Sequence, residues 1–594
     1  MQQVQTFFAT ALMPIVVGIT GHRDLHPHDI DGLKKTVRII FCELRKKYPN
    51  SPLVLLSPLA EGADRLVAEV ALEMNKLEPD NPIKLIVPMP FHQSEYEKDF
   101  EDPTSLLIFR EILGQASKSF TLNSDNQGNN IPREQSYFEV GKYIVEKSQL
   151  LIALWDGVNN CKKGGTSDIV QLCLTGNCYG NGIGQDETPA AIDNIFNPIQ
   201  TGVVYHVVTR RVSNEIPTAP DNRFLRLGVA ATIEPCSIND LYPQPLNDVA
   251  GDTVFDRMLK CRDDMNEVIK NNYTQLQDNM EKSSEWLIPE KIRSTLPDDI
   301  KHQIKLFSLW DAIAMFYQKK NNLSLIWMAS IIPLLALAIE IYKSYTNNIV
   351  FVAVYLVLLS VAFALYKISD NKKWLIKYID SRALAEGLRV SIFWRIAGIN
   401  KSAADYYINR QRSEAEWIRD AIRGYDLSAP GGAEVDNSTA YSVILTNWVL
   451  AQGKYFRDAS QRNKDRYGLS SNRSKYLMYF GMFVINPIMV ISHYTKFAGD
   501  NIDNAILVAL PVVFVAAVAI DYYSDRMMFD DNFKHYVVMG SLFTNVKSYL
   551  DRKSEKIMNN NVREVLFELG KEALAESGNW MQMHRERALE VPKL

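Results

Sequence analysis

A pair of glycines in front of a helical pattern is the strongest chemical signal in this sequence. Gly164 and Gly165 follow the apolar run Leu150–Trp155, and Thr166 then begins an amphipathic stretch. Glycines let the backbone approach an anion closely, and the free N–H groups and positive dipole end at the start of a helix bind it. The segment therefore predicts a phosphate site, with Asp168 in the first turn of its helix.

Two other segments place polar residues at the ends of predicted strands. Gly18–Leu25 contains Arg23, whose planar guanidinium suits a phosphate or a carboxylate. Ser57–Ala71 contains Glu61, a candidate for ribose hydroxyls or a base edge. The ligand contacts that the three segments predict are Thr20, Gly21, His22, Arg23, Glu61, Gly62, Asp64, Arg65, Trp155, Asp156, Gly164, Gly165, Thr166 and Asp168.

These residues allow both a binding and a structural interpretation. Trp155 can flank a base, and Asp156 can take a hydroxyl group. Arg23 is equally consistent with a solvated residue of a tight turn, and Asp64 with an ordinary cap in a first helical turn. No catalytic residue is assigned, because no nucleophile and base occur at a recognisable spacing.

The sequence predicts neither a metal site nor a resident cofactor. His22, His26 and His28 lie near Asp24 and Asp29, but an HxH pattern beside a proline is weak evidence for a metal. The six cysteines show neither paired nor zinc-type spacing, so reduced thiols are expected. These cysteines lie at positions 42, 161, 173, 178, 236 and 261.

The elements that must position these residues alternate between short β-rich runs and amphipathic helices from residue 14 to about 210. This alternation is typical of a doubly wound parallel α/β sheet of the Rossmann-like kind, in which ligands bind where the strand order reverses. The predicted strands are Pro14–Thr20, Pro52–Ser57, Ile83–Pro88, Lys118–Leu122, Leu150–Trp155 and Gly202–Val208.

The bulk composition excludes one class of partner. The chain has 594 residues, enough for several domains, and a net charge of only −4. No global basic field exists, so a nucleic acid polymer is not expected as a partner. The first twelve residues lack a basic region, and no cleaved signal peptide is expected.

Four apolar runs of nearly membrane-spanning length occur in the second half of the chain, at about 323–342, 349–366, 476–495 and 504–520. Buried helices of a soluble domain are the alternative interpretation. The loops inside the two pairs, 343–348 and 496–503, carry one lysine each, whereas the outer flanks are much more basic. By the positive-inside rule, both termini and the segment between the two pairs are expected to be cytoplasmic.

Each pair of runs follows an aromatic-rich helix and precedes a long amphipathic helix, which indicates a parallel repeat. Two small hairpins enclose little space, so a conduit requires a homo-oligomer, for which a tetramer is our guess. Asn486, in the middle of the third run, is the candidate pore residue, and bonding to a neighbouring helix is the alternative.

The predicted domain boundaries follow from these patterns. The all-α membrane region comprises two hairpin units that a connector of loop composition separates. The predicted ranges are 13–235 for the nucleotide-binding domain, 236–320 for a helical coupling segment, 321–422 for the first hairpin unit, 423–445 for the connector and 446–594 for the second hairpin unit with its C-terminal cytoplasmic helix.

Residues 14 to about 235 resemble the SLOG superfamily of Rossmann-like nucleotide sensors and LOG-type phosphoribohydrolases. The residues that carry the resemblance are VGITGHRDL, LAEGADRLVAEVA, and WDG followed by GGTSDIV. The membrane half is similar to the SLATT group of two-span effectors, through WVLAQGKYFRDA before the third run and LFELGKEALAESGNWMQMHRER after the fourth.

This pairing implies a sensor of a nucleotide-derived second messenger that gates or assembles a membrane-disrupting channel or pore in bacterial antiphage defence. The implied ligand is a cyclic oligonucleotide or a cyclic ADP-ribose-like molecule, and the implied partner is a messenger-producing enzyme that acts through its product. LOG enzymes resemble one another in a PGGxGTxxE stretch, whereas KKGGTSDIVQ here lacks the glutamate. Catalysis is therefore not the expectation.

Two other functions remain open from the sequence. The first is a membrane-tethered hydrolase of a nucleotide or NAD-derived compound, in which Asp64, Asp156 or Asp168 acts on the substrate. The second is a membrane scaffold with a vestigial site. Product formation distinguishes the hydrolase, whereas the scaffold predicts neither a bound ligand nor ion flux.

Overall fold

The computed structural model describes residues 10–122, 132–158, 162–176, 202–213, 224–227, 254–346, 348–407, 416–428, 434–495, 500–553 and 556–586. The chain forms two compact units. The sheet unit comprises Met1–Tyr273 and Asn409–Ser428, and the helical unit comprises Thr274–Ile408 and Ala429–Leu594.

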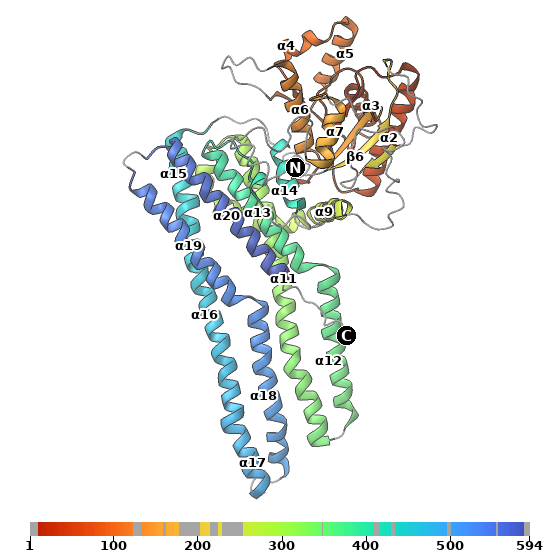
Figure 1. The fold of residues 1–594 in the computed structure, drawn as a ribbon. Helices are drawn as coiled ribbons and strands as arrows, with labels where there is room; N and C mark the ends of the chain where they lie inside the picture. Colours follow the sequence, from red (N-terminus) through yellow and green to blue (C-terminus); the bar gives the residue numbers. More distant parts are fainter. Residues whose placement is uncertain are drawn as a thin grey trace. The chain divides into compact units, whose positions relative to one another are not determined.

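A seven-stranded sheet organises the first unit (Figure 1), in the order β4-β3-β2-β1-β5-β6-β7. The strands are β1 (Ile15–Gly21), β2 (Leu53–Leu56), β3 (Lys84–Met89), β4 (Lys118–Thr121), β5 (Leu150–Trp155), β6 (Val203–Val208) and β7 (Phe224–Leu227). The first six are mutually parallel, which confirms the six predicted strands. The sequence analysis missed β7, a four-residue edge strand that pairs antiparallel with β6.

Helices cover both faces of this sheet, as the fold prediction requires. The helical elements are η1 (Pro27–Asp29), α2 (Ile30–Lys47), α3 (Ala63–Leu77), α4 (Gln93–Tyr96), η2 (Glu97–Asp99), α5 (Pro103–Gly114), α6 (Arg133–Lys147) and α7 (Thr166–Thr175). Ile15, Val17 and Ile19 pack with side chains of α2, α3 and α5, whereas Val16 packs with α6 and α7. Alternate residues of β1 therefore enter two separate cores.

Two further helices complete the sheet unit from far along the chain. α9 (Val254–Leu287) begins in this unit, and α14 (Glu416–Ser428) belongs to it entirely. The Tyr425 hydroxyl of α14 donates to the Ala11 carbonyl oxygen at 2.8 Å. The predicted connector thus begins inside a helix, because buried Trp417, Ile418, Ala421, Ile422 and Tyr425 give α14 one apolar face.

The helical unit contains α10 (Glu290–Arg293), α11 (Asp298–Ile341), η5 (Tyr342–Thr346), α12 (Ile349–Asn371), α13 (Trp374–Ile396), η6 (Ala403–Asp405), α15 (Asn437–Ile444), η7 (Leu445–Leu450), α16 (Ala451–Phe480), η8 (Gly481–Ile485), α17 (Asn486–Thr495), α18 (Asp500–Arg526), α19 (Phe529–Asp551) and α20 (Asn560–Glu586). Among the described residues, four helical stretches are long and apolar enough to cross a membrane. These stretches contain the four predicted spans.

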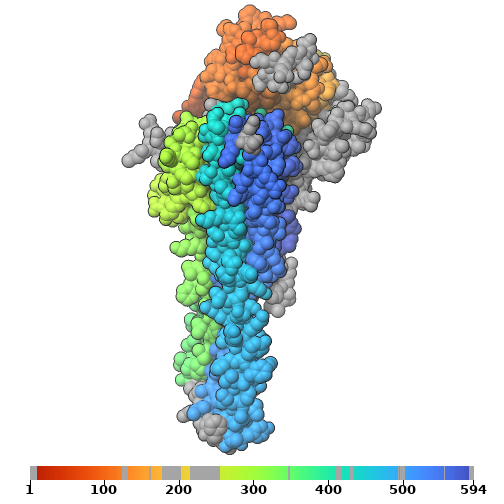
Figure 2. Space-filling view, turned by 90° about the vertical axis from the view of Figure 1, so that its left-hand side faces the viewer, coloured from red at the N-terminus to blue at the C-terminus, as the bar shows by residue number. Residues whose placement is uncertain are grey.

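The four spans form an open row. Figure 1 shows them in the order α16 with α17, α18, α11 and α12, and Figure 2, turned by 90°, shows α16 in front. The contacts agree with this order, because α12 packs on α11, α11 on α18, and α18 on α16. In the most apolar window of the α12 span, no residue is buried inside the chain. One chain therefore exposes apolar helix faces on both sides of the row.

The junction that follows the second span has the same backbone geometry in both hairpins. The segments SDNKKW, from Ser369, and SDRMMF, from Ser524, join each span to the next helix. Lys373 and Met528 adopt left-handed φ values of 50° and 53°. Each N–H donates to the carbonyl oxygen of the aspartate three residues earlier, at 2.9 Å and 3.0 Å. This shared geometry supports the predicted repeat.

Candidate functional site

The first and third predicted segments meet where the strand order reverses. β1 and β5 are neighbours, with Thr20 paired to Ala153 and Gly21 paired to Leu154. From this point the chain order runs outward to β4 on one side and to β6 on the other. The carboxyl ends of two adjacent parallel strands therefore place His22 and Asp156 side by side, as expected for a switch point.

His22 and Asp156 form a buried pair. The Asp156 N–H donates to His22 Nε2 at 3.1 Å, and Asp156 Oδ1 lies 3.0 Å from the same nitrogen. The Val158 N–H also donates to Oδ1, at 3.0 Å. Burial favours a higher pKa for Asp156, but the adjacent His22 ring and the Val158 N–H bring it below its ordinary value. This carboxylate therefore anchors the two loops.

The second segment contacts the first through Gly62. This glycine has a left-handed φ of 79°, and a Cβ there would lie 2.3 Å from the Arg23 carbonyl oxygen and 2.5 Å from that of His22. The Ala63 N–H, at the start of α3, donates to the His22 carbonyl oxygen at 3.0 Å. Only glycine fits at this position. The first N–H group of α3 is bonded within the protein and is therefore not open to a ligand.

The side chains of Arg65 and Glu61 form hydrogen bonds with other residues of the same loop and with α5. The buried Arg65 donates to the Leu59 carbonyl oxygen at 3.0 Å and to Ser105 Oγ at 2.6 Å, and its guanidinium lies 4.3 Å from the centre of the Phe100 ring. The Ser105 hydroxyl donates in turn to Glu61 Oε1. Arg65 therefore shapes the loop, while the half-buried Glu61 keeps an edge at the surface.

Asp64 is the residue of the site whose pKa is shifted toward neutral pH. Its side chain is buried, and desolvation raises its pKa to about 7 against the opposing charges of Arg23 and Arg65 and the Ala60 N–H. A carboxyl group with such a pKa exchanges a proton near neutral pH. That property suits either a pH-sensitive contact or a general acid or base.

Arg23 is the exposed cation at the switch point. Its guanidinium lies 5.3 Å from the centre of the Tyr137 ring, and no carboxylate among the described residues forms an ion pair with it. The neighbouring arginines differ, because Arg210 pairs with Asp29 at 2.6 Å and Arg211 pairs with Asp24 at 2.9 Å. Arg23 therefore remains available to an anionic ligand.

The glycine pair lies where the sequence predicts it, directly before α7. Gly164 has a left-handed φ of 71°, and Gly165 is the N-cap of the helix. The half-buried Thr166 follows, but Asp168 is fully buried and accepts the Gly164 N–H at 2.8 Å. The Gly165 N–H also donates within the protein, to the Lys162 carbonyl oxygen at 2.9 Å. The N–H groups of both glycines are therefore already bonded, and Thr166 at the helix start is the part of this segment open to a ligand.

Trp155 lies inside the core. Its side chain is 1% exposed, its Nε1 donates to the Val158 carbonyl oxygen at 3.1 Å, and its ring centre is 5.1 Å from that of His206. Burial lowers the pKa of His206 to about 4, so this histidine is neutral. A base-flanking role for Trp155 would require the loop to open.

The structure adds ligand candidates that the sequence analysis did not single out. Tyr137, on α6, contacts Arg23, and its neighbour Phe138 lies against Gly164, so α6 joins the first and third segments. The exposed Lys163 lies beside the glycine pair, with its Nζ 5.4 Å from the centre of the Phe138 ring. The KKGG run was readable in the sequence, whereas Tyr137 lies at no strand end.

Other expectations concern metals, thiols and the membrane. No group of three or more potential metal ligands occurs among the described residues. Cys42 and Cys173 are thiols, and the cysteines at positions 161, 178 and 236 lie outside the described residues, as do residues 236–253 of the predicted coupling segment. Asn486 begins α17 and is exposed on the single chain, so its predicted pore role concerns an assembly of chains.

All three predicted segments thus converge at one edge of the sheet, with one exposed arginine and one glycine-rich helix start. No protein-family model matches this chain, and no curated protein matches it. The resemblance to the SLOG and SLATT groups therefore stays a prediction.

Proposed function

We propose that this protein binds a nucleotide-derived signalling molecule at the carboxyl edge of its sheet and that binding opens or assembles a pore made by its membrane spans. The observation that carries the proposal is the exposed Arg23 guanidinium at the switch point, which has no carboxylate partner among the described residues. Ionised guanidinium groups bind phosphate in a bidentate manner. An arginine with a purely structural role would be expected to have a carboxylate partner, as Arg210 and Arg211 have.

The neighbouring groups suit the other parts of a nucleotide. The start of α7 at Thr166 offers a backbone N–H and the positive end of the helix dipole to a second phosphate oxygen. Glu61 is placed to accept ribose hydroxyls, and the Tyr137 ring offers a stacking surface. Cyclic oligonucleotides and cyclic ADP-ribose-like molecules share these parts, and both are candidate ligands.

Coupling to the membrane follows the chain connections. The chain passes between the two units at 273–274, 408–409 and 428–429. α14 belongs to the sheet unit but lies in the sequence between the two hairpins. A ligand that prefers one arrangement a thousandfold supplies about 4 kcal/mol per site. Several sites in an oligomer multiply that bias.

The open row of spans favours a homo-oligomeric pore, because one row does not surround a channel. We place the assembly in a bacterial inner membrane with both termini in the cytoplasm. An enzyme that makes the messenger is the functional partner, and antiphage defence is the setting that the resemblance implies.

The test uses the full chain in detergent. It is incubated with linear, cyclic and NAD-derived nucleotides, and the bound and free fractions are separated chromatographically. We expect one compound to be retained intact, and Arg23→Ala to weaken its binding about tenfold or more, because a hydrogen bond to a charged group is lost. Arg38→Ala, an exposed arginine paired with Glu73 on the surface, is the matched control.

Ion flux from liposomes then follows with the retained compound. Flux in the native chain and in Arg38→Ala, but not in Arg23→Ala, supports a ligand-gated pore. Retention of the compound without ion flux would support a nucleotide sensor and would contradict the ligand-gated pore. Absence of any retained or consumed compound favours the scaffold.

A hydrolase is the second candidate, and Asp64 is the observation that favours it. A buried carboxyl group with a pKa of about 7 can transfer a proton at neutral pH. Consumption of a nucleotide by the native chain, and its loss in Asp64→Asn, would establish this activity. A ligand recovered unchanged after long incubation would exclude it for that ligand.

A further inference from the structure

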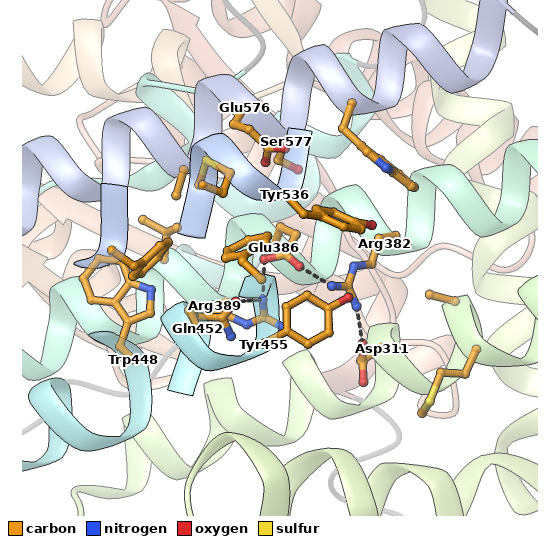
Figure 3. A pocket seen from close by; sticks show the side chains of 18 of the residues that line it. Asp311, Arg382, Glu386, Arg389, Trp448, Gln452, Tyr455, Tyr536, Glu576 and Ser577 are labelled. Carbon is orange, nitrogen blue, oxygen red and sulfur yellow. Dashed lines mark hydrogen bonds and ion pairs between the residues drawn. The ribbon is translucent and has the colours of Figure 1, made fainter. Parts of the chain in front are cut away.

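The helical unit contains a partly open cavity of about 130 Å³ between its helices (Figure 3). Its walls come from α11, α13, η7, α16, α19 and α20, so both hairpin repeats contribute. None of the predicted ligand contacts lies here. The cavity is separate from the sheet edge in the sequence and belongs to the other compact unit.

An ionic network of buried and half-buried side chains forms one side of this cavity. Arg382 pairs with Asp311 at 3.2 Å and with Glu386 at 2.7 Å, and Arg389 pairs with Glu386 at 2.5 Å. Figure 3 shows Glu386 between the two guanidinium groups. Two arginines and two carboxylates balance each other. An additional net charge inside this wall would have no partner and would be costly to bury.

The remaining carboxylate of the lining is also balanced. Glu576, on α20, lies 3.0 Å from His535 Nδ1. The hydrogen bond with this carboxylate raises the pKa of His535 above its ordinary value. The lining therefore favours a ligand without net charge.

Two tyrosine hydroxyls that line the cavity have no hydrogen-bond partner among the described residues. Tyr455 and Tyr536 both point their hydroxyl groups toward Arg382 in Figure 3. No residue in the described part of the chain hydrogen-bonds to either hydroxyl, whereas the Tyr378 hydroxyl accepts the Gln318 amide at 3.0 Å. Inward polar groups normally have a protein or solvent partner. These hydroxyls can donate to, or accept from, a molecule in the cavity.

Aromatic rings form the opposite walls. The ring centres of Phe456 and Phe543 are 5.7 Å apart, and those of Trp448 and Phe543 are 6.4 Å apart. Such surfaces stack on flat molecules. An apolar cavity of about 150 Å³ holds benzene, and this cavity, at about 130 Å³, is close to that size.

We propose that this cavity is a second ligand site, which takes an uncharged single-ring compound carrying both hydrogen-bond donors and acceptors, such as an aromatic amide. The amide or hydroxyl group meets Tyr455, Tyr536 and the ionic network, and the ring lies among the aromatic walls. This inference does not depend on the proposed function, because it uses no residue of the sheet edge.

The test is thermal unfolding and equilibrium dialysis of the full chain in detergent. The probes are nicotinamide, benzamide and phenol, with benzoate and benzylamine as charged counterparts of similar size. We expect at least one neutral probe to bind and to raise the unfolding temperature, and the charged pair to bind at least tenfold more weakly. Arg38→Ala, on the surface of the sheet unit and outside both sites, should leave these values unchanged.

Two kinds of variant locate the binding. Ala573→Leu extends a side chain from α20 into the cavity and should abolish probe binding. Combined Tyr455→Phe and Tyr536→Phe keep the rings and should weaken binding about tenfold through two lost hydrogen bonds. Tyr467→Phe, an exposed tyrosine on α16 outside this cavity, is the matched control.

Three results would overturn the proposal. Failure of all neutral probes to bind would show that the cavity holds only water. Stronger binding of benzoate or benzylamine would exclude the uncharged class. Unchanged binding in the double tyrosine variant, whose rings preserve the packing, would place the probes elsewhere even where Ala573→Leu does not fold.

Discussion

Asp64 and His206 are buried ionisable side chains whose pKa values move in opposite senses. The pKa of Asp64 rises from 3.8 to about 7, so the folded state favours its protonated form. The pKa of His206 falls from 6.5 to about 4, so the folded state favours its neutral form. Between pH 4 and 6.5, Asp64 makes the fold less stable as pH rises, while His206 makes it more stable.

A comparison with Asp64→Asn isolates the aspartate. In the native chain, the contribution of Asp64 to the free energy of unfolding is lost as pH rises from about 4 through 7. The reason is that its carboxyl group ionises more easily in the unfolded chain than in its buried site. We therefore expect the unfolding temperature of Asp64→Asn, relative to the native chain, to increase across this range. Differential scanning fluorimetry in one detergent measures it. Asp80→Asn, at an exposed position, should show a flat difference, and a flat difference for Asp64→Asn would contradict the shifted pKa.

At the scale of elements, a buried arginine connects α9 and α14 to the start of the sheet. Arg262 donates to the Pro14 carbonyl oxygen at 2.8 Å and to Gln149 Oε1 at 3.1 Å. Its Nη2 lies 3.4 Å from Asp420 Oδ2, and both side chains are buried. Burial lowers the pKa of Arg262, against the opposing charge of Asp420. α14 is therefore attached to the sheet unit by a desolvated ion pair.

Arg262→Ala should loosen α14, because it removes the nearer arginine of the buried Asp420 carboxylate and leaves only Arg423, whose Nη1 lies 3.9 Å from Asp420 Oδ1. Such a loss costs about 3–5 kcal/mol. Hydrogen exchange read by mass spectrometry should show faster exchange of the α14 amides in the full chain. Arg38→Ala, which removes an exposed pair, should leave α14 protected. Unchanged α14 exchange in Arg262→Ala would mean that apolar packing alone holds the helix.

The two left-handed junctions after the second spans of the hairpins differ in one respect. Lys373 is exposed, whereas Met528 is buried. A non-glycine residue in this conformation carries steric strain, which glycine removes at some entropic cost.

Lys373→Gly should therefore stabilise the fold by about 0.5 kcal/mol, since it relieves strain and loses no buried surface. Met528→Gly should destabilise it by about 2 kcal/mol, because the lost apolar burial exceeds the relieved strain. Thermal unfolding of the full chain compares the two variants directly. Stabilisation by both would show that the burial of Met528 contributes less than its strain costs. Destabilisation by both would show that glycine at position 373 relieves too little strain to offset its entropic cost.

At the scale of the whole molecule, the row of four spans sets the membrane topology. We predict that each hairpin crosses the membrane twice, which puts both hairpin loops on one side and the sheet unit on the other. The exposed Cys42 of the sheet unit is a native reporter of its own side.

Cysteine labelling in intact cells tests this topology. Ser344→Cys and Asn504→Cys, near the two hairpin loops, should react with an impermeant maleimide from outside, whereas Cys42 should react only after permeabilisation. Lys553→Cys, after α19, should behave like Cys42. Labelling of only one of the two loop variants from outside would contradict the predicted two-hairpin arrangement.

The sequence by itself determined the strands and the spans. Six strands were readable because short apolar runs buried on both faces are a local property of a parallel sheet. The four spans were readable because membrane insertion depends on apolar length, which the residues of one segment supply. The convergence of Arg23, Gly62 and Gly164 followed from one topological rule for parallel sheets.

Only the tertiary structure decided which of those residues face outward. Trp155 and Asp168 have the right types for a ligand site, but one packs in the core and the other caps its own helix. The attachment of α14 and the cavity around Arg382 join residues far apart in the chain. Burial and pairing depend on neighbours that distant segments supply, whereas periodicity and hydropathy depend on adjacent residues. That physical difference separates what could be predicted from what had to be observed.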